Sequence, residues 1–191
     1  MELIEDKTYA GTDFSIEPFP KGEYEQCVFT ACNFSNADLT EIRFFKCEFV
    51  DCNLSLADIS MAAISDTKFS SCKMVGMQFS DCKKFNLSFT FESCKLDHSS
   101  FAGLKLRKTI FSNSELIEVD FTDCDLSLSV FNGCDLARSI FDKSILEKVD
   151  FRSAFNYAID PERNRIKKAK FSIVGLPGLL QKYDIDIGGS K

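Results

Sequence analysis

The chain has 191 residues, a net charge of −6 and 45% hydrophobic residues, among them 20 Phe and no Trp. This length suits one domain or a repeat rod with a cap. No apolar run approaches the roughly 18 residues of a membrane-spanning helix, and the acidic start lacks the basic and apolar parts of a signal peptide. We therefore expect a cytoplasmic protein that does not enter a membrane.

Large apolar residues recur at every fifth position, which we call the centre of each repeat. Centres run from Phe14 to Phe79 and resume, two residues out of step, from Phe91 to Phe151. A period of five matches neither the helical period of about 3.6 nor the strand period of 2, so it predicts a repeat architecture in which the chain turns a corner every five residues. The position two before each centre, which we call the slot, is mostly small, and all nine cysteines occupy it.

In chain order, we expect an N-terminal cap over residues 1–13, a repeat domain over 14–155 and a C-terminal segment over 156–191. Residues twenty apart stack if four repeats complete one coil. A continuous Phe column then requires a bulge of two extra residues near 83–89, where Lys84 is the only polar centre. That column reads Phe29, Phe49, Phe69, Phe91, Phe111, Phe131, Phe151 and Phe171.

The C-terminal segment contains apolar residues with helical spacing. These residues are Leu176, Leu179, Leu180 and Tyr183. Their spacing of i, i+3, i+4, i+7, with a proline in the first turn, predicts a short helix over about residues 177–183. Its apolar face either caps the last coil of its own chain or pairs with the same face of a second chain.

Two segments carry a recognisable signature. Ala37-Asp38-Leu39-Thr40-Glu41 and Cys124-Asp125-Leu126-Ser127-Leu128 resemble the A(D/N)LXX repeat of the pentapeptide-repeat family. The resemblance implies an all-β repeat solenoid, folded as a right-handed quadrilateral β-helix of about seven coils. The chain also resembles Qnr-like fluoroquinolone-resistance members of that family. This implies a DNA mimic that binds DNA gyrase or topoisomerase IV, with no direct contact to nucleic acid, and a homodimer formed through the C-terminal helix.

The charges support two alternative functions. Residues 1–60 hold twelve acidic against four basic side chains, and one face carries Asp38, Glu41, Asp58, Asp81, Asp120, Asp123 and Asp142. We call these seven residues the acidic face and expect it to bind the partner. The adjoining face is basic or neutral, with Arg43, Lys46, Lys105, Arg107, Lys108 and Lys148. Plain solvation also explains such rows of charge. The alternative function is an interaction scaffold without a topoisomerase link, which would use Ile110, Val130, Ile140 and Ile145.

The sequence offers little for catalysis or metal binding. Cys27-x4-Cys32 and Cys47-x4-Cys52 have spacings near those of zinc ligands. Ser, Ala and Thr fill the same slot elsewhere, however, so the cysteines are interpreted as small buried residues with reduced thiols. His98 is the single histidine, and no phosphate-binding glycine motif is present. We expect no enzyme activity, no cofactor and no metal.

Overall fold

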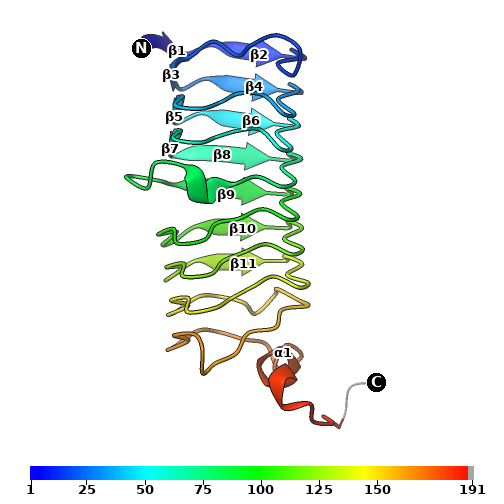
Figure 1. The fold of residues 1–191 in the computed structure, drawn as a ribbon. Helices are drawn as coiled ribbons and strands as arrows, with labels where there is room; N and C mark the ends of the chain where they lie inside the picture. Colours follow the sequence, from blue (N-terminus) through cyan, green and yellow to red (C-terminus); the bar gives the residue numbers. More distant parts are fainter. Residues whose placement is uncertain (189–191) are drawn as a thin grey trace.

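The computed structural model describes residues 1–188, which form a rod of stacked coils with a short helix at its C-terminal end (Figure 1). Parallel strands build two sheets, ordered β1-β3-β5-β7 and β11-β10-β9-β8-β6-β4-β2. The strands are β1 (Glu2–Glu5), β2 (Thr8–Ala10), β3 (Gly22–Glu25), β4 (Val28–Thr30), β5 (Arg43–Phe45), β6 (Glu48–Val50), β7 (Ala63–Ser65), β8 (Thr67–Ser70), β9 (Phe89–Glu92), β10 (Ile110–Ser112) and β11 (Val130–Asn132). The helix α1 spans Pro177–Leu180, and single 3-10 turns span Phe79–Asp81 and Gln181–Tyr183. The predicted β-helix with a terminal helix is confirmed.

The strand register shows that four repeats complete one coil. Strand β4 pairs with β6 so that Phe29 lies beside Phe49, twenty residues later. The second sheet keeps the same offset where β3 pairs with β5. On the other two faces, isolated bridges join Asn33 to Asn53 and Asp38 to Asp58. Equivalent residues of successive repeats therefore lie in straight rows along the rod, about 4.8 Å apart.

A left-handed residue turns most corners of the coil, and this explains the period of five. It falls two positions after the centre, as at Asn36 (φ 57°) and Glu41 (φ 62°). Such a conformation costs a non-glycine residue roughly 1 kcal/mol or more. The cost is offset because each corner N–H is held by the next coil; that of Glu41 donates to Ser60 O at 3.0 Å.

The interior is filled by stacked side chains, including the predicted Phe column. Successive rings of that column stack with centroids 4.7 to 5.4 Å apart, from Phe29 to Phe171. Rings of the neighbouring column meet them edge to face, as Phe101 meets Phe111 at 5.9 Å. The column is therefore confirmed, and it extends one ring further, because Tyr9 stacks on Phe29 at 5.0 Å.

The irregular coil lies between β8 and β9, where a loop projects from the rod (Figure 1). Phe69 pairs with Phe91, an offset of 22 residues in place of 20. Lys84 turns outward, and its place inside the rod is taken by the half-buried Leu87 and the buried Phe89. Phe89 therefore puts a ring where other coils have a small slot residue, 5.3 Å from Phe79. The sheet that contains β7 ends here.

Stacked coils continue beyond both expected boundaries of the repeat domain. Residues 1–13, expected to form a cap, contain β1 and β2, which pair in parallel with β3 and β4. Ile4 and Tyr9 keep the five-residue register and pack against the core, although the sequence analysis placed the first centre at Phe14. At the other end, bridges reach Arg165 and Lys170.

Candidate interaction surfaces

The seven residues of the acidic face lie in two neighbouring rows. In the first row, bridges join Asp38 to Asp58, and join Gln78 through Ser100 and Asp120 to Ile140. The second row follows the adjacent corner and runs Glu41, Met61, Asp81, Gly103, Asp123 and Lys143. Asp142 immediately precedes the last corner of that row. The face is thus acidic along most of the rod, with polar and apolar positions between the carboxylates.

Ion pairs reduce the charge at both ends of the acidic face. Lys21 Nζ lies 2.7 Å from Asp38 Oδ1, and Arg163 Nε lies 2.6 Å from Asp142 Oδ1. Hydrogen bonds from Lys21 and from Thr40 lower the pKa of Asp38 to about 2. The sequence analysis did not identify these two bases, because both come from neighbouring coils. Within residues 1–188, Glu41, Asp58, Asp81, Asp120 and Asp123 have no basic partner within 4 Å.

A shallow open hollow of about 470 Å³ lies in the middle of this face. Asp58 and Asp81 line it, together with Gly76, which lies beside the Leu56 side chain. Leu56 is 61% exposed, and Met61, which follows at the next corner, is 53% exposed. The centre of the acidic face therefore combines unpaired carboxylates with accessible apolar side chains.

The other predicted surface residues do not form a second patch. Ile110 lies beside Val130 where β10 pairs with β11, but Ile140 and Ile145 lie on the two other faces. Ile110 and Ile140 are exposed, whereas Val130 and Ile145 are half-buried. On the basic face, Arg43 pairs with Glu23 at 2.8 Å and Arg107 lies 3.8 Å from Asp125. Lys46 lies 4.5 Å from the Phe45 ring centroid, and Lys105, Lys108 and Lys148 are exposed.

The C-terminal helix contacts the last coil through one side of its apolar residues. Leu179 packs against the core, while Leu176, Leu180 and Tyr183 are exposed. These four apolar residues do not share one face of the helix. Only four residues are α-helical before the chain tightens into a 3-10 turn, and this changes the angle between successive side chains. Tyr183 instead donates its hydroxyl to Glu162 Oε1 at 2.8 Å.

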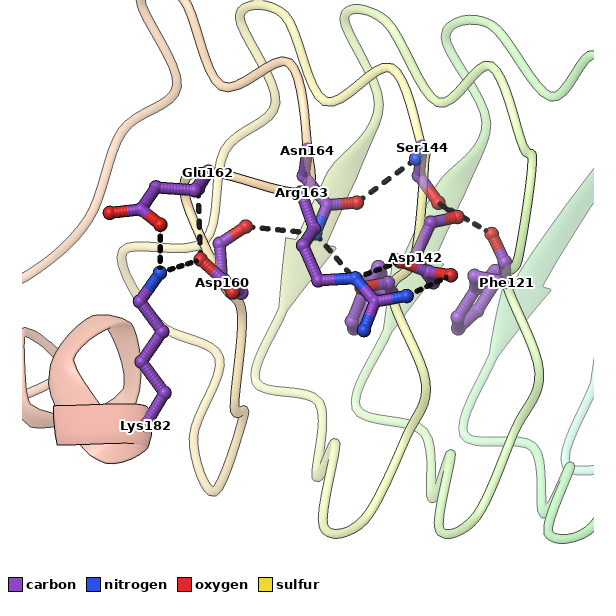
Figure 2. A network of polar contacts seen from close by, with 9 residues as sticks. Phe121, Asp142, Ser144, Asp160, Glu162, Arg163, Asn164 and Lys182 are labelled. Carbon is purple, nitrogen blue, oxygen red and sulfur yellow. Dashed lines mark hydrogen bonds and ion pairs between the residues drawn. The ribbon is translucent and has the colours of Figure 1, made fainter. Parts of the chain in front are cut away.

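Polar contacts attach this helix to the rod (Figure 2). Lys182 Nζ lies 2.7 Å from both Asp160 Oδ1 and Glu162 Oε2. Hydrogen bonds with these carboxylates raise the pKa of Lys182 and lower the pKa values of Asp160 and Glu162. The helix is therefore held by exposed ion pairs and by Leu179, with its remaining apolar surface left uncovered in the single chain.

The slot residues carry hydrogen bonds between coils, a role that the sequence analysis missed. The backbone N–H of Ser144 donates to Asn164 Oδ1 of the next coil at 3.0 Å. The Ser144 hydroxyl donates to Phe121 O of the preceding coil at 2.7 Å, and Asn164 Nδ2 repeats this bond to Phe141 O at 2.8 Å (Figure 2). A slot side chain thus pairs backbone groups that would otherwise be buried without partners.

Cysteine performs the same task with sulfur. Cys52 Sγ accepts from the backbone N–H of Cys32 at 3.4 Å and donates to Phe29 O at 3.3 Å. The sequence contained one signal for this role, because Cys and Ser, which are common in the slot, are both small and both carry a hydrogen-bond donor. The sequence analysis interpreted the slot by size alone, and size does not explain why residues with a donor are preferred there.

The thiols are poorly suited to nucleophilic chemistry. All nine cysteines lie within the described residues, and each is buried and free of a disulfide. Burial raises the pKa values of Cys47, Cys82 and Cys124 to about 12. His98 Nδ1 lies 3.0 Å from Glu118 Oε2 on the surface. Within residues 1–188, no group of three or more His, Cys, Asp or Glu side chains is arranged to hold a metal ion, and no helix is long and apolar enough to cross a membrane.

Comparisons with known proteins place this rod among similar folds. A family model described as a pentapeptide repeat region matches residues 23–90 and 87–154. The structure of a trypsin-treated variant of QnrB1, a plasmid-mediated fluoroquinolone resistance protein, aligns with a TM-score of 0.71 at 18% identity, covering 98% of this chain and 92% of that one. A second trypsin-treated QnrB1 variant aligns at 0.62 and 17% identity, covering 97% and 99%. No curated protein sequence matches.

Proposed function

The chain belongs to the pentapeptide-repeat family, and from that premise we propose that it is a non-enzymatic cytoplasmic protein that mimics DNA. In this proposal it binds a type II topoisomerase, DNA gyrase or topoisomerase IV, through its acidic face. The observation that carries the proposal is the set of five carboxylates on that face that have no basic partner among the described residues. The similarity of the rod to QnrB1, a fluoroquinolone resistance protein, favours this class of partner.

The spacing of the carboxylates is consistent with a DNA-binding groove as the receiving surface. The acidic face extends over five coil steps, or about 24 Å, and carries seven carboxylates. This corresponds to one carboxylate per ~3.4 Å, close to the phosphate spacing of one DNA strand, which is about 3.4 Å. The two ion-paired residues lie at the ends, and the remaining five carboxylates extend over four coil steps, or about 19 Å, which corresponds to one carboxylate per ~4 Å. Such a row attracts a basic groove by the electrostatic forces that attract DNA itself.

Reversing the charge in the second row of the acidic face should weaken the effect of the chain on a topoisomerase. We expect the wild-type chain to inhibit gyrase supercoiling, or to protect it from a fluoroquinolone, below roughly 10 μM, a binding free energy of about −7 kcal/mol. The triple variant Glu41→Lys, Asp81→Lys, Asp123→Lys should weaken this at least about 10-fold, because like charges then face the basic groove. Lysine is already present at left-handed corners, as at Lys46 and Lys108, so the fold should be retained.

The matched control carries the same change in net charge on other faces, with Glu2→Lys, Glu48→Lys and Asp51→Lys. It should keep the wild-type effect. Absence of any effect of the wild-type chain at 10 μM, or equal loss in both triple variants, would rule out recognition through the acidic face. The scaffold alternative would then be tested with Ile110 and Val130, the one adjacent pair among its four residues.

We further propose that the chain forms a homodimer through its C-terminal helix. The support is the apolar surface left uncovered around that helix, where Val174 is 90% exposed and Leu176 and Leu180 are also accessible. Leu180→Asp should convert a dimer to a monomer in light scattering, because it places a charge in the seam without removing the Leu179 contact. Leu3→Asp, at the opposite end, should leave the mass unchanged. A monomeric wild-type chain would show that the helix is only a cap.

A further inference from the structure

Four consecutive coils carry a cysteine in the same slot. These residues, which we call the thiol column, are Cys32, Cys52, Cys72 and Cys94, and each is 2% exposed. Every thiol donates to a carbonyl of the preceding coil, with Sγ to O distances of 3.6, 3.3, 3.4 and 3.4 Å. Each also donates to the carbonyl two residues before it in the chain. Identical acceptors require the same side-chain conformation, so the four C–S bonds are parallel.

Parallel side chains on stacked coils place neighbouring sulfur atoms one coil step apart, at about 4.8 Å. A disulfide needs its sulfurs at about 2.05 Å and its Cβ atoms at about 3.5–4.5 Å, so the column does not close into disulfides without moving the backbone. With the zinc–sulfur distance of about 2.3 Å as a scale, two metal–sulfur bonds placed in line extend about 4.6 Å. The spacing that disfavours a disulfide therefore fits one ion between two thiolates.

We propose that neighbouring thiols of this column bind a soft monovalent cation of the Cu(I) class in linear two-sulfur sites. Thiolate ligands select such ions over harder ones. On binding, two S–H bonds break, two metal–sulfur bonds form and two protons leave to solvent, with no electron transferred. The product has one net negative charge, and the backbone N–H of Cys32, which already donates to Cys52 Sγ at 3.4 Å, stabilises charge on that sulfur.

In the metal-free chain the four thiols of the column carry their protons, since each donates to a backbone carbonyl. A cation that binds between two of these thiols therefore displaces both protons. Because two protons are released per ion, apparent affinity should rise about 100-fold for each unit of increasing pH.

The remaining cysteines provide internal comparisons. Cys27 and Cys47 occupy consecutive coils of another slot row and donate to carbonyls of the preceding coil in the same way, so they form one further pair. Cys82, Cys124 and Cys134 have no cysteine in the slot of either neighbouring coil. The geometry therefore accommodates three ions: one between Cys27 and Cys47 and two in the thiol column.

The test is titration of the reduced, oxygen-free chain with Ag(I), and with Cu(I) in competition with bicinchoninate, after long equilibration because the thiols are buried. Native mass spectrometry should show three ions per chain with unchanged circular dichroism. Cys72→Ser should hold two, since serine keeps the slot hydrogen bonds, as Ser114 does, but leaves Cys94 without a partner sulfur. Cys124→Ser removes a solitary thiol and should still hold three.

Three outcomes of the mass-spectrometric titration would overturn the proposal. These are equal stoichiometry in the Cys72→Ser and Cys124→Ser chains, uptake that follows the total thiol count, and uptake only when circular dichroism reports unfolding. A pH dependence of about 10-fold per unit would also contradict the two-thiolate site, because it would indicate one proton released per ion.

Discussion

Phe111→Ala should lower the free energy of unfolding by about 3–5 kcal/mol. Phe111 is fully buried and stacks between Phe91, at 5.2 Å, and Phe131, at 4.8 Å. Removing its ring leaves a cavity that the neighbouring coils do not refill, because their hydrogen bonds fix the coil spacing. Edge-to-face contacts with the rings of the adjacent column are lost as well. Urea denaturation followed by circular dichroism gives the free-energy difference.

The control for this variant is Phe85→Ala. Phe85 lies in the projecting loop and is 84% exposed, so its replacement should change stability by no more than about 0.5 kcal/mol. A loss below about 1 kcal/mol for Phe111→Ala would show that the coils collapse around the missing ring. The two variants together distinguish the effect of losing a ring of the Phe column from the effect of losing an exposed Phe.

Asn164→Ala should cost about 2–4 kcal/mol, by leaving two buried backbone groups, Ser144 N–H and Phe141 O, without partners and removing one of the two donors to Asp160 O. Asn164 is 7% exposed; its Oδ1 accepts from Ser144 N, and its Nδ2 donates to Phe141 O and to Asp160 O. The backbone of the last coil should open first, since these bonds join it to the coil before it. Hydrogen exchange at Ser144 N should accelerate more than exchange at amides near the N-terminus.

Lys167→Ala is the matched control for Asn164→Ala. Lys167 is exposed in the same coil, and its removal should alter stability by less than about 0.5 kcal/mol. If Asn164→Ala changed the stability as little as Lys167→Ala, the slot side chains would only fill space and their hydrogen bonds would not contribute to stability. A loss confined to Asn164→Ala would establish that the slot stabilises the stack through polar contacts.

The fold was predictable from the sequence because every centre requires the same thing, a large apolar side chain that faces the interior. A five-residue spacing and the two-residue offset before Phe91 are sufficient to predict the coil, the Phe column and the irregular segment. The N-terminal boundary was harder to predict, since the slots before Ile4 and Tyr9 hold Glu2 and Lys7 in place of small residues. The replacement of Lys84 by Leu87 and Phe89 depends on which side chains the loop directs inward, and spacing does not specify this.

The acidic face was predictable as a set of positions but not as a distribution of charge. Register assigns Asp38 and Asp142 to their rows, yet the bases that neutralise them come from neighbouring coils. Whether long side chains such as those of Lys21 and Arg163 pair with these carboxylates depends on their conformations, which the repeat leaves open. The hollow beside Gly76 depends likewise on where the Leu56 side chain lies.

The loop before β9 has a consequence for the length of the chain. Coils on either side of it remain in register although two residues have been added, so the stack tolerates a change in length at this site. Closing a longer flexible loop costs only about 0.6 kcal/mol for each doubling of its length. The exposed segment from 84 to 86 is therefore a natural position for peptide insertion. An epitope or affinity tag placed there would project sideways from the rod, and both ends of the rod would stay free.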